Sequence, residues 1–399
     1  MKRILFVDDD IPVLNGLKVR LHGLRNKWDM HFVDSGARAI EDLERSHFDV
    51  VVTDMRMPGM DGAELLRIVS ERWPDALRIV LSGYAELQQV VRLVPYAHQY
   101  YSKPCEPGHL ENLIDRCLYL HDLLRQPALR AVVGRVRNLP AMPRVYARLQ
   151  RMLTDNSVSV RDVAAVITED AAIAAKVLQL VNSAFFRLAR RITNLELAVS
   201  HLGFAAIRNL VLSAELFSRW PAHEGTSALN IEKLQSHVHL VAAAARALAA
   251  HTPAADDALL AGLLHDIGYW ILANECQSEL AGSLQLASTR RIPLHEAEIQ
   301  VIGASHAQIG AYLLGIWGLP YPIIEAVALH HTPESVTQSE FDALAVLAVA
   351  HALVPADDTT VFDVPLMAEP GVDATYLDSV KAPFDWAEAT RRVQAISAI

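Results

Sequence analysis

Short apolar runs alternate with amphipathic stretches along the first third of the chain. Runs rich in β-branched and aromatic residues predict five strands, at residues 4–7, 30–34, 50–54, 77–82 and 99–103. Apolar residues at helical spacing predict helices around residues 11–26, 36–46, 61–72, 86–95 and 106–124. This alternation predicts a (βα)5 fold, in which helices cover both faces of an open, doubly wound parallel sheet.

The strand pattern ends near residue 125, and the rest of the chain carries apolar residues at helical spacing. Examples are "VRDVAAVITEDAAIAAKVLQLV" (160–181) and "HVHLVAAAARALAAH" (237–251). Two prolines in "NLPAMP" (138–143) interrupt the chain where this helical half is expected to begin. The segment after about residue 356 is rich in loop-forming residues, and a closing helix is expected from Trp386 onward. An all-helical part should therefore follow the α/β part.

Composition narrows the class of protein. The 399 residues suffice for two or three domains, and 52% hydrophobic with 21% charged residues is ordinary for a soluble globular protein. The net charge of −10 and the lack of a basic stretch disfavour a DNA-binding output, so no nucleic-acid partner is expected. Three cysteines without metal-ligand spacing favour a reducing, cytoplasmic setting. No apolar run predicts a signal peptide or a membrane span, so no membrane partner is expected.

Polar residues with complementary chemistry follow four of the predicted strands. They are Asp8, Asp9 and Asp10 after the first strand, Asp54 at the end of the third, Ser82 at the end of the fourth and Lys103 at the end of the fifth. In parallel α/β sheets, ligands bind beyond the carboxyl ends of the strands. Clustered carboxylates repel one another, and Mg²⁺, which prefers oxygen ligands, relieves that repulsion. A hydroxyl and an ammonium group nearby would suit a phosphoryl group on an aspartate. The alternative is that the acids are turn residues and helix caps.

Four blocks in this part carry a family resemblance. "ILFVDDD", "VVVTDMRMPGMDG", "IVLSGYAE" and "YYSKPC" resemble the receiver, or CheY-like, domain of two-component response regulators, over residues 1–121. The resemblance implies that Asp54 accepts a phosphoryl group, that Asp8, Asp9, Asp54 and the backbone carbonyl of Arg56 hold Mg²⁺, and that Ser82, Tyr100 and Lys103 respond to the phosphate. For Tyr100, an ordinary core or surface aromatic remains the alternative. Phosphorylation would add nearly two negative charges and repack the face around residues 82–104.

The helical half contains the stretch "GLLHDIGYW" (262–270), which places a histidine beside an aspartate in an apolar run. This doublet is similar to that of the HD-type metal-dependent phosphohydrolases. The resemblance implies a metal site, with iron, manganese or zinc as the expected ion, drawn from His237, His265, Asp266, His306, His330, His331 and His351. His239 is a less favoured substitute for His237. A bound metal would lower the pKa of a water molecule and polarise a phosphoryl oxygen.

Two substitutions depart from the catalytic pattern. His351 stands where those relatives carry a closing aspartate, and Tyr269 stands where they carry a lysine that would pair with substrate phosphate. The glycine-tyrosine-proline signature expected after the pair at 330–331 is also absent. The structural alternative is that the histidines are core or capping groups. In that case Asp266 would tie helices together by hydrogen bonding, without metal.

Four further blocks fit a related, mostly non-catalytic family. "NLPAMPRVYARLQRML", "VAAVITEDAAIAAKVLQLVNSAFF", "AVSHLGFAAIRNLV" and "AGLLHDIGYWIL" resemble the HDOD domain, a relative of the HD fold, over residues 136–335. Residues 122–135 are then expected to form a linker helix, and residues 336–399 a C-terminal helical extension.

The combined resemblances imply a bacterial response regulator. A histidine kinase would phosphorylate Asp54, and a non-catalytic HDOD module would act on downstream signalling proteins by protein–protein contact. The alternative is a receiver-gated, metal-dependent HD-type phosphohydrolase or cyclic di-GMP phosphodiesterase. The sequence leaves open the kinase, the downstream partner, the direction of the switch and whether the chain forms a homodimer.

Overall fold

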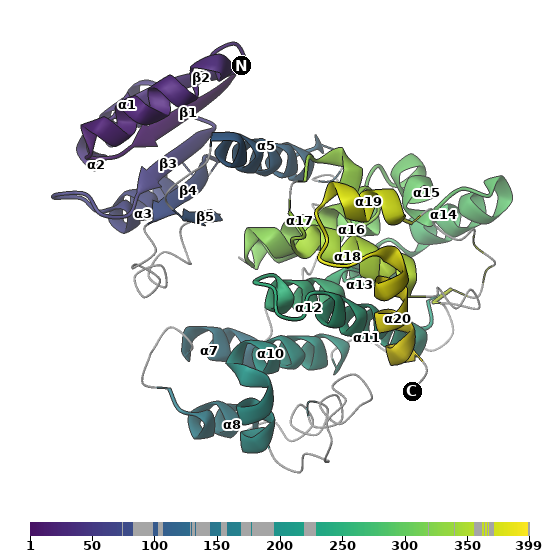
Figure 1. Ribbon diagram of the computed structural model, residues 1–399. Helices are drawn as coiled ribbons and strands as arrows, with labels where there is room; N and C mark the ends of the chain where they lie inside the picture. Colours follow the sequence, from purple (N-terminus) through teal and green to yellow (C-terminus); the bar gives the residue numbers. More distant parts are fainter. Residues whose placement is uncertain are drawn as a thin grey trace. The chain divides into compact units, whose positions relative to one another are not determined.

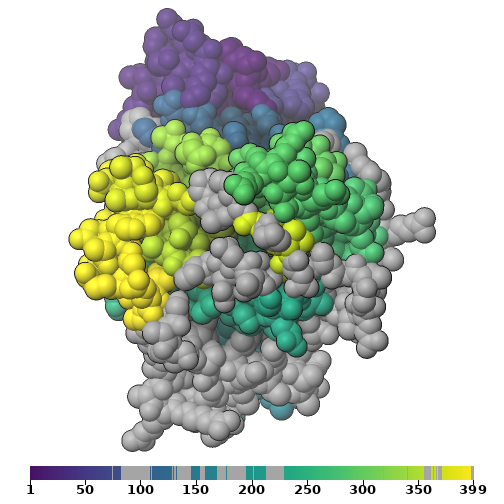
Figure 2. Space-filling model, turned by 90° about the vertical axis from the view of Figure 1, so that its right-hand side faces the viewer, coloured from purple at the N-terminus to yellow at the C-terminus, as the bar shows by residue number. Residues whose placement is uncertain are grey.

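The chain divides into two compact units, Met1–His121 and Asp122–Ile399, in this computed structural model (Figure 1). In the space-filling view of Figure 2, the first unit is coloured purple to blue and the second teal to yellow. The structure describes residues 1–397 except 74, 83–98, 103–106, 128, 130–131, 133–143, 153–157, 169–176, 178–194, 219–228, 318, 339, 355–360, 363, 365 and 367–370.

The first unit is built on the predicted parallel sheet. Its strands are β1 (Lys2–Val7), β2 (Trp28–Val33), β3 (Val50–Asp54), β4 (Leu77–Ser82) and β5 (Gln99–Ser102). All neighbouring pairs are parallel, and the strand order is β2-β1-β3-β4-β5. Because the order reverses between β1 and β3, the crevice beyond the carboxyl ends of these two strands is the expected ligand position.

In the described part of this unit, four helices and one short 3-10 helix accompany the sheet. They are α1 (Ile11–Arg20), α2 (Gly36–Arg45), α3 (Gly62–Arg72) and α5 (Pro107–Leu124), with a short 3-10 helix, η1 (His22–Leu24), after α1. Asp10, Ser35 and Asp61 cap the first three of these helices, each accepting a hydrogen bond from the backbone N–H three residues on. The helix predicted over 11–26 is shorter than expected, and the one predicted over 86–95 lies outside the described residues.

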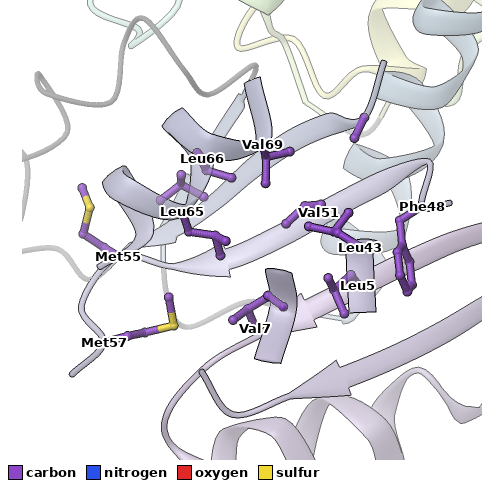
Figure 3. Packing of buried hydrophobic residues seen from close by; sticks show 13 residues of the cluster. Leu5, Val7, Leu43, Phe48, Val51, Met55, Met57, Leu65, Leu66 and Val69 are labelled. Atoms are coloured by element: carbon purple, nitrogen blue, oxygen red, sulfur yellow. The ribbon is translucent and has the colours of Figure 1, made fainter. Parts of the chain in front are cut away.

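A tightly buried core joins α2 and α3 to one face of the sheet (Figure 3). Leu5, Val7 and Val51 point to this face from β1 and β3, and Leu43 of α2 and Leu66 of α3 pack against them. Alternate residues of the same strands, Ile4 and Phe6 among them, are equally buried on the other face. Burial on both faces explains why the strands appear in the sequence as continuous apolar runs.

In the described residues of the second unit, the regular elements are helices, apart from one isolated bridge between Leu229 and Phe362. Its helices are α7 (Arg144–Met152), α8 (Val160–Thr168), α10 (Leu195–Ser218), α11 (Ile231–Leu248), α12 (Ala255–Leu264), α13 (Gly268–Glu275), α14 (Gln277–Arg290), α15 (Leu294–Val301), α16 (His306–Ile316), α17 (Tyr321–Leu329), η3 (Pro333–Ser335), α18 (Ala343–Leu353), α19 (Ala374–Ser379) and α20 (Trp386–Ser397). The α/β plus all-α fold class is confirmed, and the closing helix begins at Trp386 as predicted.

Helices α11, α12, α17 and α18 form the apolar centre of this unit. Helix α11 packs on α12 and α18, and α17 packs on α12, α16 and α18. Every residue from Ala343 to Ala350 in α18 is buried, as expected for a helix that is apolar on all sides. Two glycines allow close approach: a Cβ atom on Gly262 would lie 2.6 Å from the Cα of Ala242, and one on Gly268 would lie 1.9 Å from the carbonyl oxygen of His306.

Within the described residues, no individual helix is long and apolar enough to cross a membrane. Among the helices that the structure describes, one bent pair, α15 and α16 with 76° between them, reaches the required length and hydropathy when taken together.

Candidate functional sites

Two carboxylates lie at neighbouring strand ends in the first unit. Asp8 follows β1, Asp54 ends β3, and the pairing of Val7 with Thr53 brings the two ends level. The side chain of Asp8 is 3% exposed and accepts a hydrogen bond of 3.0 Å from the N–H of Asp10. Asp54 Oδ2 accepts a bond of 2.7 Å from the N–H of Arg56. The structure therefore brings two predicted magnesium ligands to the crevice where the strand order reverses.

The loop after β3 folds back against Asp54. Gly59 adopts a positive φ of 81°, which a residue with a side chain disfavours. A Cβ atom on Gly62 would lie 2.2 Å from the backbone oxygen of Asp54, so only glycine fits at the start of α3. The positive φ of Gly59 and the close packing at Gly62 give a physical reason for the two glycines of "MPGMDG", since both features set the backbone around residues 54–56.

Of the predicted response residues, Ser82 and Tyr100 are described by their backbone alone. Ser82 ends β4 and pairs with Ser102 of β5, while Tyr100 pairs with Val80. Lys103 and the side chains of Ser82 and Tyr100 lie outside the described residues. Asp9 is exposed beside Asp8, and Asp10 serves as the cap of α1, which is the structural role considered above for acids after a strand.

In the second unit, two histidines stand at equivalent positions just beyond helix ends. His265 follows α12 and His330 follows α17. Nδ1 of each lies 2.8 Å from the carbonyl oxygen three residues earlier, that of Gly262 or Val327. The last carbonyls of a helix lack intrahelical partners, so each ring satisfies one of them by donating from Nδ1. When the ring is neutral, Nε2 carries no proton and has a free electron pair.

These and four other side chains come together as two groups of three histidines. The ligand atoms of each group lie within 4.8 Å of one another. The first group, here called the 265 trio, is His237, His265 and His351; the second, the 306 trio, is His306, His330 and His331. No candidate group within the described part of the chain includes His239, so His237 is the residue that the structure favours.

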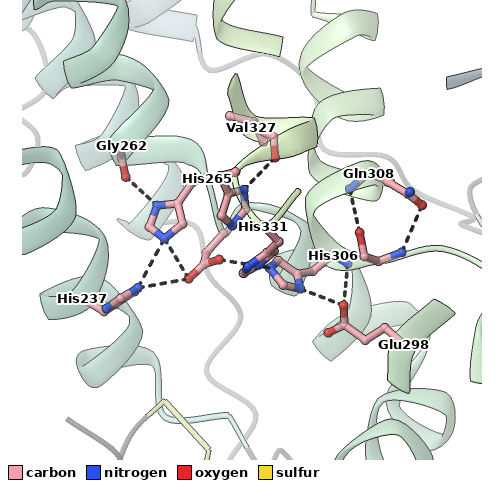
Figure 4. A network of polar contacts seen from close by, with 11 residues as sticks. His237, Gly262, His265, Glu298, His306, Gln308, Val327 and His331 are labelled. Atoms are coloured by element: carbon pink, nitrogen blue, oxygen red, sulfur yellow. Dashed lines mark hydrogen bonds and ion pairs between the residues drawn. The ribbon is translucent and has the colours of Figure 1, made fainter. Parts of the chain in front are cut away.

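Asp266 has a carboxylate oxygen close to one histidine of each trio, and these two histidines, His265 and His306, are labelled in Figure 4. Its Oδ2 is 3.3 Å from Nε2 of His265, and its Oδ1 is 3.3 Å from Nε2 of His306. Asp266 also forms a third group with His265 and His330. One carboxylate thus faces both trios, and all seven candidates of the helical half are brought together.

Two residues that the sequence did not single out complete the surroundings. Glu298 of α15 is fully buried and accepts hydrogen bonds from the backbone N–H (2.8 Å) and Nδ1 (2.7 Å) of His306. His295, one turn earlier, stacks on His331 with ring centroids 4.5 Å apart. A histidine and a glutamate three residues apart on a short helix are the only sequence signal for them.

The buried charges alter three pKa values. Burial alone would raise the pKa of Asp266, but His265 and His306 outweigh it and hold that pKa well below the usual value. Burial would lower the pKa of His306, yet the carboxylates of Glu298 and Asp266 raise it to about 10. Burial and the neighbouring histidines, His331 first among them, lower the pKa of His330 well below 6.5. His330 is therefore neutral and able to donate its electron pair to a metal.

The donor set fits a transition metal. Within the described residues, the buried Nε2 of His330 has no hydrogen-bond partner, and an ion in the 306 trio would coordinate its electron pair. Six imidazoles and a single carboxylate suit iron or zinc better than magnesium, which prefers oxygen ligands. Nδ1 donates a hydrogen bond to an oxygen acceptor in His265, His306 and His330. Metal-binding histidines usually make such a bond with the nitrogen that does not bind the metal.

An aromatic pair covers one side of the 306 trio. The ring of Tyr269 stacks on His306 at 4.2 Å between centroids, and Phe362 meets Tyr269 edge-on at 5.0 Å. Tyr269 is 5% exposed and Phe362 is 4% exposed. The position where a lysine would face a substrate phosphate is therefore filled by a buried ring stacked on a candidate ligand.

Family models match both parts of the chain. Residues 4–115 match the response regulator receiver domain, and residues 139–333 match the HDOD domain. An uncharacterised protein of Treponema pallidum is 27% identical over 214 residues, or 50% of this chain and 39% of the relative. The hydrogenase transcriptional regulatory protein HoxA of Cupriavidus necator is 37% identical over 109 residues, or 27% of this chain and 22% of the relative. The chain spans well under half the length of these curated relatives.

A solved structure resembles the helical part. The crystal structure of an HDOD domain protein from Geobacter sulfurreducens is 25% identical, with a TM-score of 0.53, and the match covers 68% of this chain and 91% of that one.

Proposed function

This chain joins a response regulator receiver domain to an HDOD domain, and from that combination we propose that it is a phosphorylation-dependent response regulator. Asp54 accepts a phosphoryl group from a histidine kinase, with Mg²⁺ held by Asp8, Asp9, Asp54 and the carbonyl of Arg56. The HDOD domain is the output and acts by protein–protein contact.

The level ends of β1 and β3 carry this proposal. They hold Asp8 and Asp54 in the crevice of a β2-β1-β3-β4-β5 sheet, and Mg²⁺ would offset the repulsion between such carboxylates. The ion and the N–H of Arg56 would also neutralise charge on an incoming phosphate. Ser82 and Lys103 follow the ends of β4 and β5, where a phosphoryl group on Asp54 would draw their side chains toward it.

Labelling with acetyl phosphate and Mg²⁺ tests the phosphoacceptor. The wild-type chain should gain one phosphoryl group, measured by intact mass, and Asp54→Asn should gain none. Asp34→Asn is the matched control, because Asp34 also follows a strand end, that of β2, and pairs with Arg38 at 2.8 Å. Equal labelling of wild type and Asp54→Asn would refute the assignment.

The histidine groups favour a second activity, metal binding in the HDOD domain. His237, His265 and His351 would hold one ion, and His306, His330 and His331 another, with Asp266 between them. A metal so held would supply Lewis acidity and a bound water of lowered pKa. This chain's residues would fix the ion and exclude water from the side covered by Tyr269.

We favour a metal-stabilised scaffold over a phosphohydrolase. Tyr269 offers no cation to a substrate phosphate, and its ring covers His306 together with Phe362. His351 also supplies a neutral ligand where a carboxylate would bridge and carry charge. The surroundings therefore support holding an ion more than binding a phosphodiester.

Metal analysis and a hydrolysis assay separate these two functions. Purified wild-type chain should contain iron, manganese or zinc in stoichiometric amount, and His265→Ala should lose the ion of the 265 trio. The metal-loaded protein should hydrolyse neither cyclic di-GMP nor a generic aryl phosphodiester. Hydrolysis by the wild type that disappears in His265→Ala would instead establish the enzyme.

A further inference from the structure

We propose that Glu298 is a positioning residue for the metal-binding His306: it fixes which ring nitrogen faces the 306 trio and supplies charge that the trio lacks. This inference rests on the metal binding proposed above. Glu298 belongs to neither trio, and its carboxylate acts on an ion through the imidazole ring rather than by contact.

A capping box and a hydrogen bond from the backbone N–H of His306 to Glu298 fix the backbone around His306. His306 is the first residue of α16, and Ser305 caps that helix in a reciprocal capping box with Gln308 (Figure 4). Oε2 of Glu298 accepts the N–H of His306 at 2.8 Å, which satisfies one of the unpaired N–H groups of the first turn. Glu298 therefore ties α15 to the start of α16 at the residue whose ring it also binds.

The same carboxylate oxygen orients the ring. Oε2 of Glu298 is 2.7 Å from Nδ1 of His306, so Nδ1 must carry a proton and cannot bind metal. The opposite nitrogen, Nε2, is 3.3 Å from Oδ1 of Asp266 and 3.0 Å from Nε2 of His331. The contact with Glu298 thus selects Nε2 as the atom presented to the trio.

Packing prevents the ring from taking another position. Tyr269 stacks on one face at 4.2 Å, with 19° between the ring planes. A Cβ atom on Gly268 would lie 1.9 Å from the His306 carbonyl oxygen, so α13 and α16 are in direct contact there. With the face covered and Nδ1 bonded, only the Nε2 edge is left for an ion.

The charge of Glu298 also favours an ion in the 306 trio. The 306 trio contributes three neutral ligands when metal is bound, and Asp266 is shared with the 265 trio. Glu298 is fully buried, and its Oε1 has no hydrogen-bond partner within the described part of the chain. A buried carboxylate is costly unless a cation lies near it. Without metal, a doubly protonated His306 ring is that cation. A divalent ion bound at Nε2 would replace the proton and supply the charge instead, and the carboxylate would make the ring a stronger donor.

Zinc binding by matched variants tests the proposal. Glu298→Gln keeps the shape but removes the charge, and Glu296→Gln is the control, because Glu296 is exposed on the same helix. Metal-free full-length chains are titrated with Zn²⁺ against a competing chelator, and bound zinc is counted per chain. Wild type and Glu296→Gln should bind two ions, whereas Glu298→Gln should bind one of them about 10 to 100-fold more weakly and the other unchanged.

A second pair of variants identifies the route by which Glu298 acts on the ion. His306→Ala should weaken binding of the same ion, and adding Glu298→Gln to His306→Ala should leave the remaining affinity for that ion unchanged, because Glu298 acts through His306. A further loss in the double variant would overturn positioning and make Glu298 a ligand or a general structural group.

The remaining outcomes separate the two proposals. If Glu298→Gln binds both ions as wild type does, the positioning role is refuted while metal binding stands. If wild type binds no zinc, both fall.

Discussion

His265 and His330 show how a residue becomes a candidate ligand through its neighbours. Each follows a helix end and donates Nδ1–H to a carbonyl oxygen 2.8 Å away, which turns Nε2 toward the cluster. The sequence contained the histidines but not this orientation, because the orientation depends on where α12 and α17 end. The doublets at 265–266 and 330–331 thus share one arrangement: a histidine ring caps a helix end, and the next residue is a second candidate ligand.

Gly268 gives a prediction at this scale. Gly268→Ala should lower the free energy of unfolding by about 1–3 kcal/mol, because the new methyl group would overlap the His306 carbonyl oxygen on the backbone of α16. Gly282→Ala is the control, since its Cβ would meet only Val301 Cγ1 at an ordinary 3.5 Å. Urea unfolding of the helical unit measures both. Equal stability of the two variants would contradict the close contact described here.

Tyr269 gives a second prediction. Tyr269→Phe should bind zinc as wild type does, because the stacked ring is preserved, and Tyr269→Lys should weaken binding, because it places a buried cation beside His306. Zinc titration of both variants measures this. Tighter binding in Tyr269→Lys, accompanied by phosphodiester hydrolysis, would show that the aromatic ring had suppressed an enzyme.

At the scale of elements, the candidate metal groups join helices that are distant in sequence. The 265 trio draws on α11, the end of α12 and α18, and the 306 trio on α16 and the end of α17. An ion in either trio would therefore cross-link helices that already pack together. Binding to the folded state alone adds RT ln(1 + [L]/Kd) to its stability.

Metal removal should destabilise the helical unit and spare the sheet unit. At a free zinc concentration of 100 times Kd, each ion adds about 2.7 kcal/mol, so chelation should lower the unfolding temperature of the HDOD domain. Thermal unfolding of wild type with and without chelator measures the shift. His265→Ala with His330→Ala is the control and should respond little; an equal shift in that variant would place the effect elsewhere.

The sequence predicted the elements of the sheet unit closely and the helical site only in part. The patterns at 50–54 and 77–82 match β3 and β4 to the residue, because strands buried on both faces are continuous apolar runs. Helix α1 ends at Arg20, earlier than the periodicity indicated, and the chain continues as η1 around Gly23.

The seven candidate ligands came from family resemblance, and the structure brings them together. Glu298 and His295 could not be found in that way, because their roles arise from the packing of α15 against α16 and the histidine pair. No periodicity records such a contact. Likewise, nothing in the residues around 262–270 indicated that the ring of Tyr269 would lie on His306.

At the scale of the whole molecule, one helix links the two units in the chain. Helix α5 runs from Pro107 to Leu124, while the first unit ends at His121. Under the proposed function, a rearrangement that begins at Asp54 and reaches the sheet edge at β5 would meet a helix that continues past the boundary at His121 into the second unit. The linker helix predicted for residues 122–135 is described only in part and stays a prediction.

The central claim is that a phosphoryl group on Asp54 alters the helical unit, and hydrogen–deuterium exchange tests it most directly. Wild type and Asp54→Asn are compared with and without acetyl phosphate and Mg²⁺, with intact mass confirming the labelled fraction. Exchange should change in α5 and in the HDOD domain of labelled wild type, and should stay the same in Asp54→Asn. Labelled wild type whose exchange beyond residue 124 matches that of the unlabelled chain would contradict the account.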